Sequence, residues 1–341
     1  MQHIVTSARH RTAWIESGPA DGPLMIFLHG WPELGVVWRA QLDHFAAAGW
    51  RCVAPDMRGY GGSSVPAEAD AYSMPEIVAD MVELHDALGG APAVWVGHDW
   101  GSPVVWSLAA QQAGRCLAVV NLCVPYLKSG FALQNLLPLV DRALYPASRF
   151  PDGQWGYWRF YLERFDQAAA DFEADVAATV ALLYRAGRPD GIGQPARSAS
   201  VPANGGWFGA AHRAPTLPRD TTMLSADDFD TVVAGLSANG FRGPDSWYVN
   251  DAANIAYAAQ APAGGRLAMP VLFVHATWDT ICDTVHSRLA EPMRADCADL
   301  TEVSVDAGHE LMLERPAEVN AALDGWLTAR FGSRTGAARQ D

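Results

Sequence analysis

Short apolar stretches that end in turn residues recur along the chain, and this pattern constrains the fold most strongly. Each stretch is brief and rich in β-branched residues, which is typical of the buried strands of a parallel sheet. The stretches are Leu24–Leu28, Cys52–Ala54, Ala93–Val96, Leu117–Val124, Val271–Val274 and Leu300–Val305. Helix-like segments such as Met74–Leu88 and Pro103–Ala113 lie between several of them. Strands that alternate with helices predict an α/β fold with a doubly wound, mostly parallel sheet.

This alternation is interrupted in the middle of the chain. The interruption begins with helix-like runs rich in Trp, Tyr and Phe and continues as a Gly/Pro/Ala-rich connection, residues 187–218. Helical periodicity resumes at Ser225–Asn239, and the next strand-like stretch starts at Pro270. We therefore expect a core built from residues 1–127 and 266–341, with an inserted, mostly helical lid over residues 128–265.

The composition limits the classes of partner that the protein can bind. The 341 residues are 50% hydrophobic and carry a formal net charge of −14, which argues against a nucleic-acid partner and against binding to an anionic membrane surface. The N-terminus lacks the apolar region of a secretory signal, and no apolar stretch is long enough to span a bilayer. We expect a cytoplasmic protein that does not insert into membranes and is a monomer or a homodimer.

The number and spacing of the cysteines favour a role as buried core residues over metal binding or a disulfide framework. There are 5 of them, an odd number, and no two are spaced as Cys-x-x-Cys. Cys52, Cys116 and Cys123 lie within apolar runs, where a thiol commonly acts as a small hydrophobic side chain.

Asp99 occupies the centre of a Gly-x-Asp-x-Gly turn between a predicted strand and an apolar helix. Glycines on both sides let the chain turn sharply and expose the central side chain above the sheet, as in a nucleophile elbow. The central residue of such an elbow is usually serine. An aspartate in a glycine-rich turn is also a common turn-former or helix cap, so a nucleophilic role for Asp99 requires support from other motifs.

Two further motifs supply that support. The apolar run before His29 leads into His-Gly-Trp31-Pro, where the backbone N–H of Trp31, with that of Trp100, is positioned to bind a developing oxyanion. Near the C-terminus, His309 follows a predicted strand, and Asp279 ends another. The order nucleophile, acid, histidine along the chain is the order found in α/β-hydrolases.

Together these motifs resemble the epoxide hydrolase branch of the α/β-hydrolase fold, and the likeness covers nearly the whole chain. The matching segments, in order, are HGWPELGVVWRAQL, CVAPDMRGYGGSS, VGHDWGSPVVW, NGFRGPDSWYVND and DAGHELMLERPAEV. The resemblance implies that Asp99 is the nucleophile, His309 the base and Asp279 its orienting acid. It also implies that Tyr248 is one of the ring-opening acids of the lid and that the bond before Pro32 is cis.

The chemistry of epoxide opening explains these residue types. Attack by a serine on an epoxide carbon gives an ether, which cannot be hydrolysed, whereas attack by a carboxylate gives an ester. A carboxylate is ionised at neutral pH, so the first step needs no base. His309 is then needed only to activate water for ester hydrolysis, with Asp279 fixing its tautomer. The departing epoxide oxygen needs a proton, which a phenol such as Tyr248 carries at neutral pH.

The second lid acid is where the sequence departs from the family pattern. The resemblance implies a second tyrosine on the helix GYWRFYLERF, but counting back from Phe172 places Trp158 at the first tyrosine position and Tyr161 at the second. Tyr157 is one residue earlier. Three assignments therefore stay open: Tyr157, which we rank slightly first, Tyr161, or the indole of Trp158.

The pocket between lid and core should be mostly apolar, so we expect a small lipophilic epoxide as substrate. Trp158, Tyr161 and Pro32 are counted among the substrate-binding residues. No cofactor and no metal are implied, because no metal-binding spacing or phosphate-binding loop is present.

Two other functions compete with this one. A haloalkane dehalogenase uses the same aspartate nucleophile, but halide departure needs no proton and so gives no role to Tyr248. A non-catalytic, ligand-binding homologue is a more remote alternative, because all three members of the triad are present in the sequence. Chloride release, diol formation or ligand binding without turnover would distinguish the three.

Overall fold

The computed structural model describes residues 2–332 and is organised around an 8-stranded sheet with the order β1-β2-β4-β3-β5-β6-β7-β8. The strands are β1 (Gln2–Thr6), β2 (Arg11–Ser17), β3 (Leu24–Leu28), β4 (Arg51–Pro55), β5 (Ala93–His98), β6 (Cys116–Leu122), β7 (Leu267–Ala276) and β8 (Cys297–Val305). Strands β3 to β8 pair in parallel, whereas β2 pairs antiparallel with both β1 and β4. The predicted doubly wound, mostly parallel sheet is confirmed.

The antiparallel hairpin β1–β2 was absent from the sequence expectations. Its first strand lies at the sheet edge and is largely exposed, so it lacks the continuous apolar run that marks β3, all of whose residues are buried. The short apolar run Ala13–Ile15 was the available signal, with Ala13 and Trp14 buried.

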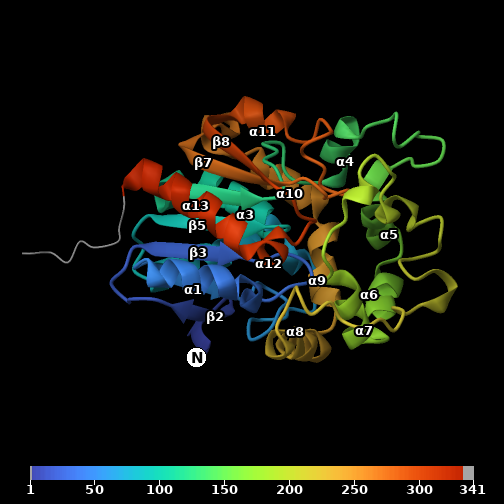
Figure 1. The fold of residues 1–341 in the computed structure, drawn as a ribbon, viewed down its shortest axis with the longest axis horizontal. Helices are drawn as coiled ribbons and strands as arrows, with labels where there is room; N and C mark the ends of the chain where they lie inside the picture. The colour runs from blue at the N-terminus through green and yellow to red at the C-terminus, as the bar shows by residue number, and fades with distance from the viewer. Residues whose placement is uncertain (1, 333–341) are drawn as a thin grey trace, which may run out of the picture.

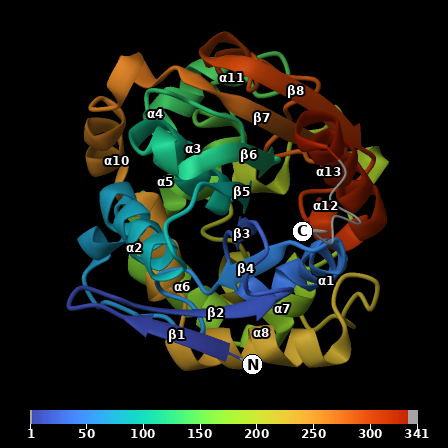
Figure 2. The same cartoon turned by 90° about the vertical axis from the view of Figure 1, so that its left-hand side faces the viewer.

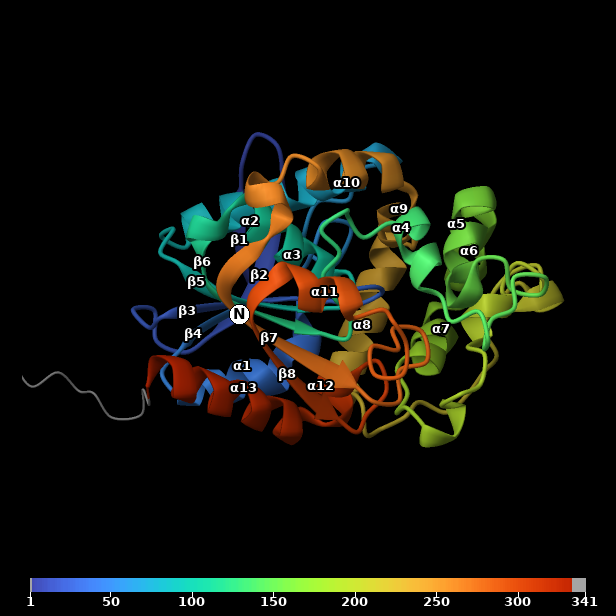
Figure 3. The same ribbon diagram turned by 90° about the horizontal axis from the view of Figure 1, so that it is seen from above.

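Helices cover both faces of the sheet (Figure 2). Helices α1 (Arg39–Ala47) and α13 (Pro316–Phe331) lie together on one face, and α2 (Met74–Ala87) and α3 (Gly101–Gln111) lie together on the other (Figure 3). Because both faces are covered, the central strands are buried on both sides, which is why their sequences are apolar throughout and do not alternate.

Residues 123–266, between β6 and β7, form no strand and fold mainly into helices. These are α4 (Leu133–Leu136), α5 (Gly156–Glu163), α6 (Phe165–Glu173), α7 (Val176–Leu183), α8 (Ala226–Asn239), α9 (Arg242–Ser246) and α10 (Asp251–Ala258). Figure 1 shows α5, α6 and α7 stacked at the right of the view, beyond the ends of the strands and away from α13. The connection 187–218 contains only short 3-10 turns (Pro189–Gly191, Arg197–Ser200, Gly209–Ala211).

Shorter helices complete the core, namely α11 (Glu291–Asp296) and α12 (Leu311–Glu314). None of the helices within residues 2–332 combines the length and the apolar character that crossing a bilayer requires.

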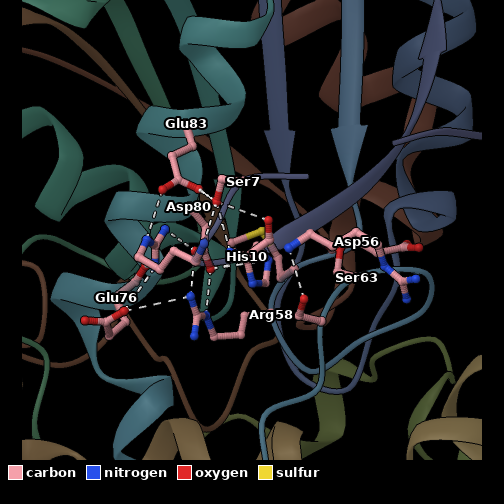
Figure 4. A network of polar contacts seen from close by, with 12 residues as sticks. Ser7, His10, Asp56, Arg58, Ser63, Glu76, Asp80 and Glu83 are labelled. Carbon is pink, nitrogen blue, oxygen red and sulfur yellow. Dashed lines mark hydrogen bonds and ion pairs between the residues drawn. The ribbon is translucent and has the colours of Figure 1, made fainter. Parts of the chain in front are cut away.

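A buried ionic network fastens the hairpin β1–β2 to α2 (Figure 4). The Arg58 guanidinium donates from Nε and Nη2 to the two carboxylate oxygens of Asp80, at 2.7 and 2.6 Å, and Arg9 of the hairpin pairs with the same carboxylate. Arg58 and Asp80 are 4% and 0% exposed. Such a pair is costly to break from one side, because the remaining charge stays buried. His10 lies against it, with Nε2 3.5 Å from Asp80 Oδ2.

His10 makes this network sensitive to acid. Burial and the charges of Arg58, Arg9 and Arg11 lower its pKa to about 3. In the unfolded state the pKa of a histidine is about 6.5. The folded state therefore binds fewer protons than the unfolded state between these two values. The resulting stabilisation is fully present above the unfolded pKa and is lost as the pH falls toward about 3.

We expect the substitution His10→Asn to make the acid limb of the stability curve shallower, by at most about 1.4 kcal/mol per pH unit. The free energy of unfolding, measured by urea denaturation on both sides of the window, checks this. His44→Asn on the exposed surface of α1 is the matched control. Parallel curves for wild type and His10→Asn would contradict the assignment.

Candidate active site

Asp99 lies at the carboxyl end of β5, in a sharp turn before α3. Its φ is 45°, in the left-handed region that residues other than glycine rarely adopt. The turn is held by the Asp99 carbonyl, which accepts a hydrogen bond from the Ser102 N–H at 3.0 Å. Gly101 allows this close approach, because a Cβ there would lie 2.1 Å from the Leu28 carbonyl oxygen of the neighbouring strand. The strand–turn–helix geometry of a nucleophile elbow is therefore present.

The loop after β3 brings a backbone donor to Asp99. The Trp31 N–H donates to Asp99 Oδ1 at 2.7 Å, and the Trp31–Pro32 peptide bond is cis. Gly30 must be a glycine, since a Cβ there would lie 2.4 Å from both Cβ and Oδ1 of Asp99. Within residues 2–332 the Trp100 N–H makes no hydrogen bond to Asp99, so Trp31 is the amide already positioned for an oxyanion.

His309 connects Asp99 to the acid Asp279. His309 Nε2 lies 3.4 Å from Asp99 Oδ2, and His309 Nδ1 donates to Asp279 Oδ2 at 2.5 Å. Asp279 Oδ1 accepts the N–H groups of Ile281 and Cys282, both at 2.9 Å, so the carboxylate is fixed in orientation. The two oxygens of Asp99 thus have different partners, with an amide at Oδ1 and the imidazole at Oδ2.

The charges of these three groups stabilise one another. Burial alone would raise the pKa of Asp99, but the hydrogen bond and charge of His309 lower it below its ordinary value. The pKa of Asp279 is lowered in the same way. Burial opposes protonation of His309, yet Asp279 and Asp99 together raise its pKa well above the ordinary value. Asp99 is therefore an ionised carboxylate at neutral pH.

Two other histidines of these motifs support the loops. The ring of His29 lies between the Gly30 carbonyl and the Met57 N–H, each at 2.9 Å. The ring of His98 contacts the His309 carbonyl through Nε2 at 2.8 Å, and its centroid lies 4.8 Å from that of the His309 ring. Both rings therefore position backbone and do not face the reacting atoms.

Our sequence analysis missed a buried carboxylate beneath the site. Glu33 is 0% exposed, accepts the Gly30 N–H at 2.7 Å and lies 3.1 Å from His98 Nδ1. Burial raises its pKa to about 7. Its position directly after Pro32 was the only signal in the sequence, and a glutamate there gives no hint of complete burial. Glu33 holds the loop that carries the Trp31 amide.

Two buried phenols of the lid, Tyr157 on α5 and Tyr248 after α9, lie side by side and sense the charge of Asp99. Their ring centroids are 5.6 Å apart, and the charge of Asp99 is among the causes that raise the pKa of each, after burial. A hydrogen bond to Tyr248 acts on the Tyr157 phenol as well. Both phenols are therefore protonated at neutral pH.

The other two lid candidates have their polar groups engaged elsewhere. The Trp158 indole N–H donates to the backbone carbonyl of Tyr248 at 2.7 Å. The Tyr161 hydroxyl accepts the Trp207 indole N–H at 3.0 Å, and Asp99 is not among the charges that shift its pKa most. Both side chains are 0% exposed and pack around Tyr248, with ring centroids 5.2 and 4.8 Å from it. Tyr157 is therefore the candidate that we carry forward as the partner of Tyr248, and this assignment stays a prediction.

Pro32 and the indole of Trp31 join the loop after β3 to the lid. The Pro32 carbonyl accepts the Tyr184 hydroxyl at 2.9 Å, and the Trp31 indole N–H donates to Asp245 Oδ1, also at 2.9 Å. Lid and loop are thus bonded directly above the sheet edge.

A cavity of about 620 Å³ reaches His309 and Asp279 from the surface. It is lined on the core side by Trp278, Asp279, Thr280, Ile281, Gly308 and His309, and on the lid side by the connection 186–198 and Trp207. A second cavity of about 760 Å³ shares Trp207 and the segment 194–197 with it and is lined by apolar lid residues that include Phe172, Leu182, Leu183 and Phe208. The site is therefore accessible beneath the lid connection.

Comparison with known proteins agrees with this geometry. The family model described as alpha/beta hydrolase fold matches residues 23–316. Epoxide hydrolase A of Mycobacterium tuberculosis is 34% identical, over 96% of this chain and 97% of that protein. Bifunctional epoxide hydrolase 2 of Sus scrofa is 30% identical over 93% of this chain, which spans 53% of that longer protein. The crystal structure of Epoxide Hydrolase A from Mycobacterium thermoresistibile aligns with a TM-score of 0.76 at 29% identity, covering 95% of this chain and 96% of that chain.

The matched fold and the nucleophile elbow define an α/β-hydrolase. Within that class, the identity to a full-length relative is high enough to assign a branch. The chain belongs to the epoxide hydrolase family, and the resemblance drawn from the five sequence segments is confirmed.

The contact between Gly30 and Asp99 gives a first test of the site. We expect Gly30→Ala to displace the Trp31 amide or the Asp99 side chain and to lower kcat/KM by at least about 100-fold, since misplacement by about 1 Å has this effect. Gly114→Ala is the control, because a Cβ there meets nothing within 4 Å. Steady-state kinetics with a model epoxide check the loss, and a thermal melt checks the fold. Comparable activity of the two variants would refute the argument.

Proposed function

We propose that this protein hydrolyses an epoxide to a vicinal diol through a covalent ester on Asp99. The observation that carries the proposal is the asymmetric environment of that carboxylate. Oδ1 is held by the Trp31 amide, while Oδ2 faces His309, and the charge of Asp99 acts on the phenols of Tyr157 and Tyr248. Nucleophile, oxyanion donor, base and ring-opening acids therefore converge on one point.

In the first step, Asp99 Oδ2 attacks one carbon of the epoxide and the bond from that carbon to the ring oxygen breaks. The electron pair stays on the oxygen, which takes a proton from Tyr248 or Tyr157. Protonated phenols are suited to this role, and burial raises the pKa of both. The products of this step are an alkyl ester of Asp99 and a phenolate.

In the second step, His309 removes a proton from water as the water attacks Cγ of the esterified Asp99. The negative charge develops on Oδ1, where the Trp31 amide already donates, with the Trp100 amide as the second donor. Collapse of the intermediate releases the diol, whose new hydroxyl takes the proton from His309. The regenerated carboxyl group loses its proton, which restores the phenol. Asp279 holds the imidazole throughout.

The hydrogen bonds of the indole N–H groups are relevant to the alternative function, that of a haloalkane dehalogenase. A dehalogenase needs free indole or amide N–H donors for the departing halide. The indole N–H groups of Trp31 and Trp158 are engaged, with Asp245 and with the Tyr248 carbonyl, but the Trp100 indole N–H makes no hydrogen bond within residues 2–332. The preference for an epoxide therefore rests on the lid phenols and on the relatives. The relatives compared above are named epoxide hydrolases. Chloride release from a haloalkane without diol formation from epoxides would reverse this preference.

The substrate we propose is a lipophilic epoxide. Aromatic side chains dominate the surroundings of Tyr248. The ring centroids of Trp31, Trp100, Trp158 and Tyr161 lie 4.8 to 6.1 Å from that of Tyr248. The apolar wall of the second cavity extends this surface under the lid. Apolar groups on the substrate gain free energy by leaving water for such a pocket.

Trapping the ester is the most direct test. Replacement His309→Gln keeps the nucleophile but removes the base, so we expect the enzyme to gain the mass of one epoxide and to turn over no further. Intact-mass spectrometry with a panel of lipophilic epoxides measures this, and peptide mapping should place the adduct on Asp99. The double variant with Asp99→Asn is the control and should gain no mass. Ligand binding without adduct or diol in any variant would point to a non-catalytic homologue.

Three matched Tyr→Phe substitutions distinguish the contributions of the lid tyrosines to ring opening. We expect Tyr157→Phe and Tyr248→Phe each to slow ester formation by at least about tenfold and together by about 10²–10⁴-fold, because general acid catalysis contributes that much. Tyr161→Phe should have a smaller effect, since its hydroxyl is engaged by Trp207. Single-turnover kinetics measure the step. A larger loss for Tyr161→Phe than for Tyr157→Phe would reassign the second acid.

The domain boundaries, the cytoplasmic location and the monomeric or homodimeric state stay predictions. The structure is compatible with a reducing compartment, because the 5 cysteines are free thiols and buried.

A further inference from the structure

Two buried thiols flank the histidine of the triad, and the reaction proposed above uses neither. Cys123 follows β6 in a left-handed conformation, with φ of 65°, and its Sγ donates to the His309 carbonyl at 3.1 Å. Cys282 follows Asp279 in the loop after β7 and is 3% exposed. The thiol of Cys282 makes no hydrogen bond within the described residues.

Cys282 points toward the catalytic groups. The charges that act on its thiol are those of Asp279, His309 and Asp99, and the same thiol acts in turn on the Tyr157 phenol. Burial raises the pKa of Cys282 well above its ordinary value, so the group is a neutral thiol and a poor nucleophile. A metal ion that takes this thiol as a ligand must therefore displace its proton.

The donor set matches that chemistry. One ligand atom each from Asp279, Cys282 and His309 lies within 4.8 Å of the other two. Thiolate, imidazole and carboxylate are the ligands that Zn²⁺ takes, and its bond lengths place ligand atoms about 3.4–3.6 Å apart in a tetrahedron. The three atoms need to move by about 1 Å to reach this spacing. Two backbone N–H groups donate to Oδ1 of Asp279 and fix the orientation of its carboxylate, as hydrogen bonds usually do for metal-binding carboxylates.

We propose that Cys282, His309 and Asp279 form an inhibitory site for a thiophilic divalent cation, Zn²⁺ or Cd²⁺. The cation takes the place of the proton between His309 Nδ1 and Asp279 Oδ2 and displaces the proton of the Cys282 thiol. The cavity that is lined by Asp279, Ile281 and His309 connects this position with solvent. A fourth coordination position remains for water or for the Cys123 thiol.

Occupation of the site stops the enzyme for a geometric reason. The hydrogen bond from His309 to Asp279 fixes the imidazole with Nε2 toward Asp99. A cation between the two groups must widen their 2.5 Å separation by about 0.9 Å, which displaces the ring from its place beside the nucleophile. Inhibition therefore rests on the proposed function, whereas binding of the cation does not.

Binding is tested first, without reference to activity. Wild-type protein should take up one Cd²⁺ per chain and show the ultraviolet charge-transfer band of a cadmium–thiolate bond. The substitution Cys282→Ala should abolish this band and weaken Zn²⁺ binding, measured by titration calorimetry, by at least about tenfold. His309→Gln should weaken Zn²⁺ binding as well. Cys297→Ala is the matched control, because it removes a buried thiol at the start of β8.

Inhibition is then measured with a model epoxide. Zn²⁺ should inhibit the wild type and Cys297→Ala equally and reversibly on addition of a chelator, and Cys282→Ala should need at least about tenfold more Zn²⁺. Cys282→Ser gives a second variant if alanine disturbs the loop. Equal Zn²⁺ and Cd²⁺ binding in Cys282→Ala and wild type would overturn the proposal. Loss of binding in Cys123→Ala alone would assign the ion to His98, Cys123 and His309 instead, which also overturns it. Absence of epoxide turnover would leave the binding result unaffected.

Discussion

The imidazole of His309 between two carboxylates is the interaction on which the site depends. Asp279 at Nδ1 and Asp99 near Nε2 hold it in one orientation and raise its pKa. In the mechanism proposed above, esterification of Asp99 removes one of these two negative charges. The pKa of His309 then falls, because only one carboxylate remains to stabilise the imidazolium. The first step therefore prepares the base for the second, and no conformational change is required for that.

The parallel sheet makes this arrangement possible. Trp31, Asp99, Asp279 and His309 each follow a strand, at the carboxyl ends of β3, β5, β7 and β8. Because these strands are parallel, their ends meet at one edge of the sheet, and residues far apart in sequence converge there. The lid closes the same edge. Direct bonds from Tyr184 to the Pro32 carbonyl and from the Trp31 indole to Asp245 join the lid to the loop that carries the oxyanion donor.

The sequence was sufficient for features that depend on local pattern. Apolar runs predicted the parallel strands, and the Gly-x-Asp-x-Gly turn predicted the elbow, since each feature is set by a few adjacent residues. The hairpin β1–β2 was missed because an exposed edge strand has no continuous apolar run. Glu33 and Cys282 were missed for a different reason. Their surroundings are formed by residues from distant parts of the chain, so neither complete burial nor proximity to His309 leaves a trace in the local sequence.

The choice of the second lid acid is a further case in which the local sequence does not determine the surroundings of a side chain. Counting along the chain placed Trp158 at the tyrosine position, but an α-helix turns by about 100° per residue, so a difference of one residue selects another face. On α5 the face toward Asp99 carries Tyr157, whereas Trp158 points toward the backbone of Tyr248 and donates its indole N–H to it. This bond has a consequence for the mechanism. It fixes the segment that carries Tyr248. In the proposed mechanism, the residue at the expected tyrosine position, Trp158, thus supports one phenol while its neighbour Tyr157 supplies the other.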